Sequence, residues 1–319
     1  MDVSFLTPAA VLFGLLAGIP LAVFAGRRKR AQNVRLALGL GDRPGRSWMV
    51  LAACLAAVPV LMGVAAAQPV VTSARTVPQR SDAEVFVVVD TSRSMLASSG
   101  TGEPTRFERA REDAIQLQDE LRDVPLGIAS LTDRVLPHLF PTVDQRVYRE
   151  TMREAVGIER PPPSTSFGTN VTALDALGAV PTLAYFTPTV KKRALVVFTD
   201  GESQPVSTLA TDFARRPRVD VTFVRMGDES ERIWETGVAE AGYKSDPAAA
   251  ATLQTAASAV RGRVLGEDQV PEAARAVRAA LGTGPTTERR IEGNRQALMP
   301  YVALLTILPL GFVLYRRNL

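Results

Sequence analysis

The chain has 319 residues, of which 46% are hydrophobic, and it carries a formal net charge of +4. A single cysteine, Cys54, excludes an intrachain disulfide, a cysteine metal cluster and a dithiol redox pair. A single histidine, His138, excludes a metal site built from several histidines.

The chain begins with an apolar segment that is long enough to cross a bilayer. Residues 6–25 carry no charge, and a membrane-spanning helix needs about 20 apolar residues. A cleaved signal peptide is the alternative, but here the positive charges follow the apolar stretch instead of preceding it. We therefore predict a first transmembrane helix over residues 1–26.

A basic segment separates this helix from a second apolar one. Residues 27–46 contain seven basic residues (27, 28, 29, 30, 35, 43 and 46) and one acid, Asp42. We predict a cytoplasmic loop here, because short, positively charged loops stay in the cytoplasm, and a second transmembrane helix over residues 47–67. The N-terminus and the chain after residue 67 would then lie outside. The positive charge thus reflects membrane topology and is no evidence for nucleic-acid binding.

A strand with polar residues at its end follows a predicted linker, residues 68–81. The run Val-Phe-Val-Val-Val over residues 85–89 is typical of a strand buried on both faces of a parallel sheet. Asp90, Ser92 and Ser94 come next, at the edge where α/β sheets bind ligands. Carboxylate and hydroxyl oxygens suit Mg²⁺, Ca²⁺ or Mn²⁺ better than zinc. The alternative is that Ser92 or Ser94 only caps a following helix.

Strands and helices alternate through the rest of this region, which indicates the α/β class with a doubly wound, mostly parallel sheet. Residues 135–140 are expected to form a hairpin with the strand before them. The other expected strands are residues 126–131, 194–199, 219–224 and 263–265, and the expected helices are residues 106–121, 253–260 and 272–281.

Two further loops carry polar residues suited to the same site. Gly168, Thr169 and Asn170 open a helix-like stretch over residues 171–185, and Asp200 ends the strand over residues 194–199.

Together with Asp90, Ser92 and Ser94, these loops resemble the metal-ion-dependent adhesion site of the von Willebrand factor A (VWA) family, over residues 82–282. The resemblance implies that Asp90, Ser92, Ser94, Thr169 and Asp200 hold a metal, with Thr172 as the alternative to Thr169. It further implies that the hydroxyls touch the metal directly and that the aspartates act partly through water.

The resemblance also implies a function in adhesion. Mg²⁺ is the expected cofactor, with Mn²⁺ or Ca²⁺ as alternatives, and a partner protein would supply an Asp or Glu carboxylate to the open position of the metal. In some family members ligation is coupled to movement of the last helix of the domain. Here that helix, residues 272–281, leads through a linker (residues 283–298) to a third predicted transmembrane helix, residues 299–315.

The basic tail, residues 316–319, places the C-terminus inside. This arrangement of three spans around a VWA domain resembles the bacterial aerotolerance-type (Bat) membrane proteins. The resemblance implies a multi-pass protein of the bacterial cytoplasmic membrane whose VWA domain is extracytoplasmic. It also implies partners among other Bat-type proteins and MoxR-type AAA+ ATPases, in envelope assembly or stress tolerance, and no enzymatic activity.

Two other interpretations remain open. A metal-dependent phosphatase could use Asp90 as nucleophile, although such enzymes need a second aspartate where this chain has Ser92. A membrane scaffold could also retain the motif without binding metal. Trp234 is either a partner contact or ordinary packing.

Overall fold

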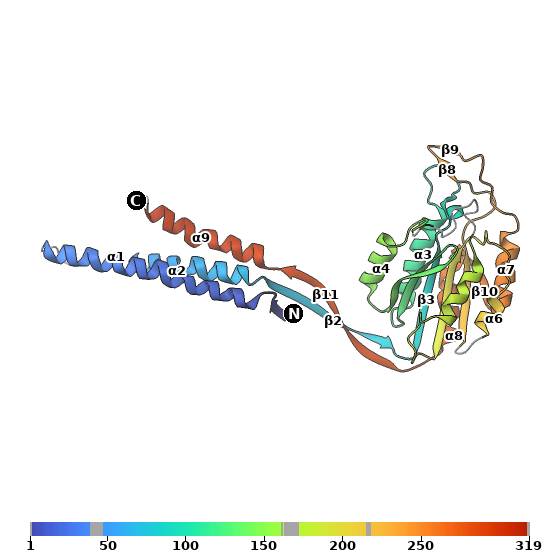
Figure 1. Ribbon diagram of the computed structural model, residues 1–319, viewed down its shortest axis with the longest axis horizontal. Helices are drawn as coiled ribbons and strands as arrows, with labels where there is room; N and C mark the ends of the chain where they lie inside the picture. The colour runs from blue at the N-terminus through green and yellow to red at the C-terminus, as the bar shows by residue number, and fades with distance from the viewer. Residues whose placement is uncertain (1, 39–46, 161, 163–171, 215–217, 318–319) are drawn as a thin grey trace. The chain divides into compact units, whose positions relative to one another are not determined.

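A computed structural model describes residues 2–38, 47–160, 162, 172–214 and 218–317 (Figure 1). The chain divides into two compact units. The first comprises Met1–Thr76 and Arg290–Leu319, and the second comprises Val77–Arg289.

The first unit contains three helical segments that are long and apolar enough to cross a membrane: Pro8–Ala37, Met49–Ala66 and Met299–Arg316. Only 6% of each apolar window is buried, so their apolar side chains face outward, as lipid-facing surfaces do. The elements of this unit are β1 (Asp2–Phe5), η1 (Pro8–Ala17), α1 (Gly18–Ala37), α2 (Ser47–Ala66) and α9 (Met299–Arg317).

The first helical segment extends further than the sequence predicts. Helical structure continues to Ala37, through the basic residues expected to begin a loop at residue 27. Its 10 residues of 3₁₀ helix at about 2.0 Å each and its 20 residues of α-helix at about 1.5 Å each span about 50 Å, more than the ~30 Å hydrocarbon core of a bilayer. The basic end of the helix can therefore lie beyond the hydrocarbon.

Both segments predicted as linkers contain strands. β2 (Pro69–Arg80) and β11 (Thr286–Ala297) are neighbours in a three-stranded sheet of order β1-β2-β11. Each runs across the boundary between the two units along the chain. Neither segment shows a strong apolar alternation, and β11 is rich in charged residues, so pairing with a distant segment determines their structure.

The second unit is built on a six-stranded sheet of order β10-β7-β6-β3-β4-β5. All neighbouring pairs run parallel except β4 and β5, which form the expected antiparallel hairpin. The strands are β3 (Ala83–Asp90), β4 (Leu126–Leu131), β5 (Val135–Thr142), β6 (Lys192–Thr199), β7 (Val219–Arg225) and β10 (Arg263–Gly266).

Helices cover both faces of this sheet, which confirms the predicted doubly wound α/β fold (Figure 1). One face packs against α3 (Arg106–Glu120), α4 (Gln145–Glu154) and α8 (Val270–Leu281). The other packs against η3 (Leu174–Gly178), α5 (Ala179–Thr182), α6 (Leu209–Phe213) and α7 (Ala249–Val260). The remaining elements are η2 (Arg93–Leu96), η4 (Glu267–Gln269), β8 (Trp234–Glu235) and β9 (Val238–Ala239).

The central strand β3 supplies both halves of the core. Every residue of β3 is buried; Val85, Val87 and Val89 face one layer of helices, and Phe86 and Val88 face the other. Burying such side chains contributes about 1.5–3 kcal/mol each. The strand that ends in Asp90 is therefore held firmly in place.

The prediction of one helix over residues 171–185 is wrong in length. The described part of this segment contains only the short helices η3 and α5, and residue 171 lies outside the described residues. Thr172 pairs instead with Ser203 in an isolated β-bridge. The second-loop segment is thus joined to the loop that follows β6 before its helix begins.

Candidate metal site

Parallel pairing brings the ends of β3 and β6 together. Val89 on β3 is opposite Phe198 on β6, so Asp90 and Asp200 emerge at the same edge of the sheet. Both side chains are buried, at 0% and 3% exposed. The structure therefore places two of the predicted site residues side by side.

Neutral groups surround the Asp90 carboxylate. Thr199 Oγ1 donates to Oδ2 at 2.6 Å, and Thr172 Oγ1 lies 3.1 Å from both carboxylate oxygens. The Ser92 amide donates to Oδ1 at 2.9 Å. Burial and the nearby charge of Asp200 raise the pKa of Asp90 to about 7, despite these hydrogen bonds.

The two serines of the first loop lie together beside Asp90. Ser92 Oγ and Ser94 Oγ are 3.0 Å apart, and both side chains are buried. Ser92 is at the N-cap position of η2, but its side chain makes no capping hydrogen bond. The interpretation of Ser92 as a simple helix cap is therefore wrong, and its hydroxyl is directed to Ser94 instead.

The second loop is described only in part. Thr169, the predicted ligand, lies outside the described residues. Thr172, the alternative, is fully buried and bonds to the Asp90 carboxylate. Its carbonyl accepts a hydrogen bond from the Gln204 amide at 2.9 Å, which fixes it against the third loop.

The third loop turns sharply after Asp200. Gly201 adopts φ +83°, and a Cβ atom there would lie 2.7 Å from the carbonyl oxygen of Ala249 at the start of α7. Glycine is required because a larger residue would be strained and would collide with the helix. The Asp-Gly pair thus lets Asp200 approach the first loop while α7 packs directly behind it.

A buried arginine holds the Asp200 carboxylate. Arg106, 2% exposed, donates from Nη1 to Asp200 Oδ2 at 3.0 Å and to Glu202 Oε1 at 3.0 Å. Arg106 is the first residue of α3, where Thr105 forms a capping box with Glu108. Its backbone amide also donates to the Ala97 carbonyl at 2.8 Å, so the start of α3 is fastened to the first loop.

The segment between β7 and α7 borders the site, and we call residues 228–245 the rim segment. It contains the short β8–β9 hairpin, which projects from one end of the sheet in Figure 1. Arg93, between the two site serines, pairs with Glu240 of the rim segment at 2.9 Å. The Tyr243 hydroxyl donates to Glu202 in the third loop at 2.8 Å. The rim segment therefore contacts both the first and the third loops.

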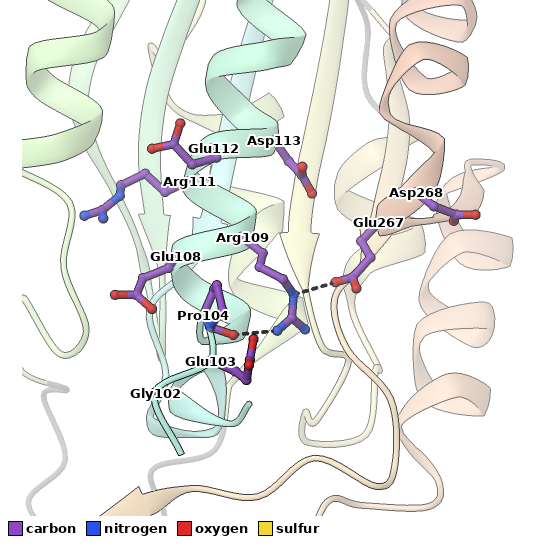
Figure 2. Close-up of a pocket in the computed structure, with 10 residues that line it drawn as sticks. All are labelled: Gly102, Glu103, Pro104, Glu108, Arg109, Arg111, Glu112, Asp113, Glu267 and Asp268. Atoms are coloured by element: carbon purple, nitrogen blue, oxygen red, sulfur yellow. Dashed lines mark hydrogen bonds and ion pairs between the residues drawn. The ribbon is translucent and has the colours of Figure 1, made fainter. Parts of the chain in front are cut away.

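An acidic cavity of about 710 Å³ lies beside α3 and η4 (Figure 2). Arg109 links this cavity to the residues around Asp200. Its guanidinium pairs with Glu231 at 2.6 Å and with Glu267 at 3.2 Å. Glu231 pairs in turn with Arg106 at 2.6 Å. The acidic residues that line the cavity are Glu103, Glu108, Glu112, Asp113, Glu267 and Asp268.

The donor atoms at the sheet edge fit a hard divalent cation. Carboxylates and hydroxyls offer only oxygen, the ligand that Mg²⁺ and Mn²⁺ prefer. No group of three or more His, Cys, Asp or Glu side chains gathers to hold a metal anywhere in the described residues. A cation here would therefore depend on the serine hydroxyls as well as on Asp90 and Asp200.

Sequence reasoning missed Arg106, although it anticipated the helix that begins there. A positive charge in the first turn of a helix is disfavoured by the helix dipole. That local misfit was the available signal that Arg106 has partners elsewhere in the fold.

Comparison with known proteins reveals the fold. The sequence matches no protein-family model and no curated protein. The structure is similar to the conserved hypothetical protein BatB from Bacteroides thetaiotaomicron, with a TM-score of 0.50 and 20% identity, covering 62% of this chain and 98% of that one. The second unit has a VWA-type fold.

Two further solved structures are similar at lower TM-scores. An aerotolerance-related membrane protein from Bacteroides fragilis has a TM-score of 0.49 and 22% identity, over 62% of this chain and 98% of that one. The manganese-loaded TRAP protein from Plasmodium vivax has a TM-score of 0.40 and 13% identity, over 70% of this chain and 83% of that one.

Proposed function

We propose that this chain is a membrane-anchored VWA protein of the Bat type that binds a partner protein through a divalent cation. Asp90, Ser92, Ser94 and Asp200, with a threonine of the second loop, would hold the cation. The observation that carries the proposal is the convergence of two buried carboxylates with two serine hydroxyls at the carboxyl edge of the sheet.

The cation would supply a Lewis-acidic position for a carboxylate of the partner. Mg²⁺ is the first candidate because it retains open or water-filled octahedral positions. Hydroxyl ligands add no negative charge, so the cation would keep its attraction for an incoming Asp or Glu. The partners proposed from the resemblance are other Bat-type proteins and a MoxR-type ATPase, in assembly or stress tolerance of the bacterial envelope.

The proposed topology follows from the basic residues. The VWA domain would be extracytoplasmic because residues 27–46 are strongly basic and Arg316 and Arg317 follow the third apolar helix. The proposed domain organisation is therefore three spans around one domain, residues 82–282.

The geometry favours binding over phosphatase chemistry. An aspartate nucleophile needs an accessible oxygen, whereas Asp90 is fully buried and both of its oxygens accept hydrogen bonds. A scaffold that keeps the motif without metal is the remaining alternative, and the experiment below separates it from the proposal.

Calorimetry with Mg²⁺ and Mn²⁺ on the detergent-solubilised full chain tests the proposal. We expect binding in the wild type, reduced at least tenfold in Ser92→Ala and lost in Asp90→Ala/Ser92→Ala. Asp220→Ala/Ser258→Ala is the matched control, since it removes the same groups from β7 and α7. Wild-type protein that binds neither cation would support the scaffold instead.

A further inference from the structure

Arg106 makes more contacts than the metal site alone requires. Besides Asp200 and Glu202 in the third loop, its guanidinium reaches four groups of the rim segment. Nε donates to Glu231 Oε2 at 2.6 Å, Nη1 to Tyr243 Oη at 3.1 Å, and Nη2 to the Asp228 carbonyl at 2.7 Å and to Ser245 Oγ at 3.1 Å. All three of its nitrogens are engaged.

We propose that Arg106 is a positioning residue that couples the candidate metal site to the rim segment, so that a cation bound beside Asp200 changes the conformation of residues 228–245. The conformation of the rim segment beside the site would then depend on the cation. This inference rests on the proposed function, because it assumes a divalent cation between Asp90 and Asp200.

The coupling follows from the shape of the guanidinium. Its N–H groups have a fixed planar geometry, so a shift toward or away from one acceptor alters the hydrogen bonds to the others. A divalent cation competes with Arg106 for the Asp200 carboxylate. Any resulting movement of Arg106 is passed directly to Glu231, Tyr243 and Ser245, because the buried guanidinium is hydrogen-bonded to all three.

Close packing around Arg106 leaves little room for independent adjustment. Gly227 precedes the rim segment at φ +68°, and a Cβ atom there would collide with both Arg106 and Glu231. The chain thus passes directly over the ion pair. A displaced guanidinium would push on the backbone that begins the rim segment.

The first loop holds the other side of the rim segment. Ser98 and Arg232 exchange backbone hydrogen bonds of 2.9 and 3.1 Å, and Trp234 Nε1 donates to the Ser98 carbonyl at 3.3 Å. Trp234 therefore lies where the rim segment meets the loop that carries Ser92 and Ser94. Its indole can report a change in that contact through fluorescence.

The test uses the full chain with Trp48→Phe, which leaves Trp234 as the only tryptophan of the two in the sequence. Mg²⁺ is titrated while Trp234 emission is recorded, and calorimetry gives the affinity of the same samples. We expect the emission to change with the calorimetric midpoint. Arg122→Gln, an exposed arginine beyond the end of α3, is the matched control and should leave both readouts unchanged.

Arg106→Lys separates charge from geometry, because lysine keeps the positive charge but lacks the planar fork. We expect it to bind Mg²⁺ within about tenfold of the parent affinity and to lose most of the emission change. Tyr243→Phe is the second variant, should the lysine variant fail to fold. It removes one hydroxyl between Arg106 and Glu202, and it should reduce the emission change without altering Mg²⁺ affinity.

Three results would overturn the inference. Mg²⁺ binding with no change in Trp234 emission would exclude the coupling and leave the proposed function intact. A full emission change in both Arg106→Lys and Tyr243→Phe would show that the rim segment responds without Arg106. Absence of both Mg²⁺ and Mn²⁺ binding by calorimetry would overturn both proposals together.

Discussion

Asp90 and Asp200 end neighbouring strands and are almost equally buried, yet the protein stabilises them by different means. Among the described residues, Asp90 accepts hydrogen bonds only from hydroxyls and a backbone amide, whereas Asp200 pairs with the guanidinium of Arg106. Hydrogen bonds from neutral groups do not compensate the charge of a buried carboxylate, whereas an ion pair does. The difference fits the raised pKa of Asp90, because a buried carboxyl group that lacks a cationic partner binds its proton more tightly.

Removing the guanidinium of Arg106 is expected to lower the free energy of unfolding more than any other change considered below. Arg106→Met would leave Asp200 and Glu202 without their cation in the interior and would remove one of the two arginines that pair with Glu231, lowering the free energy of unfolding by about 3–5 kcal/mol. Urea denaturation measures this difference, and Arg122→Gln should change it by less than about 0.5 kcal/mol. A loss below about 1 kcal/mol for Arg106→Met would mean that Asp200 does not depend on the ion pair.

Removing a hydroxyl tests the side of Asp90. Thr199→Val keeps the shape of the side chain but deletes the 2.6 Å hydrogen bond to the buried carboxylate, so we expect a loss of about 1.5–3 kcal/mol. Thr222→Val on β7 is the matched control, because the buried Thr222 hydroxyl has no partner in the described part of the chain. Thermal unfolding of the two variants should therefore differ clearly, and equal stabilities would contradict the role of Thr199.

Asp113 is a third carboxyl group and lies outside the site. Burial and the charge of Glu267 raise the pKa of Asp113 to about 7, next to the cavity shown in Figure 2. The folded state thus binds a proton more tightly than the unfolded state, and stability falls as the pH rises from about 4 through 7.

Asp113→Asn removes this penalty. After allowance for partial solvent screening, we expect a gain on the order of 1–2 kcal/mol at pH 8 that disappears near pH 4. Denaturation at both pH values measures the effect. A gain that is the same at pH 4 and pH 8 would show that it does not arise from ionisation.

The sequence predicts the fold and the position of the candidate site best where both depend on residues that are adjacent in the chain. The apolar run over residues 85–89 predicts β3 correctly, and Asp90, Ser92 and Ser94 follow it without interruption. The alternation of strands and helices predicts the α/β sheet, since each element has its own periodicity. The assignment of these residues as metal ligands stays a prediction.

Contacts between distant segments were beyond the reach of local patterns. Arg106 is separated from Asp200 by 94 positions and from Ser245 by 139, so no spacing in the sequence connects them. β2 and β11 are likewise formed by pairing between segments far apart in the sequence, although neither has the composition of a typical strand. Such features arise from the assembled fold, where tertiary contacts override local preference.

The position of β3 has a mechanical consequence. Only Ser81 and Asp82 separate it from β2, and its far end carries Asp90. A force applied between Asp90 and β2 would act along β3. This strand is paired with β4 on one side and β6 on the other. The hydrogen bonds of both ladders would then be loaded together in shear and not broken one after another. The strand that presents the first loop is therefore also well placed to resist tension.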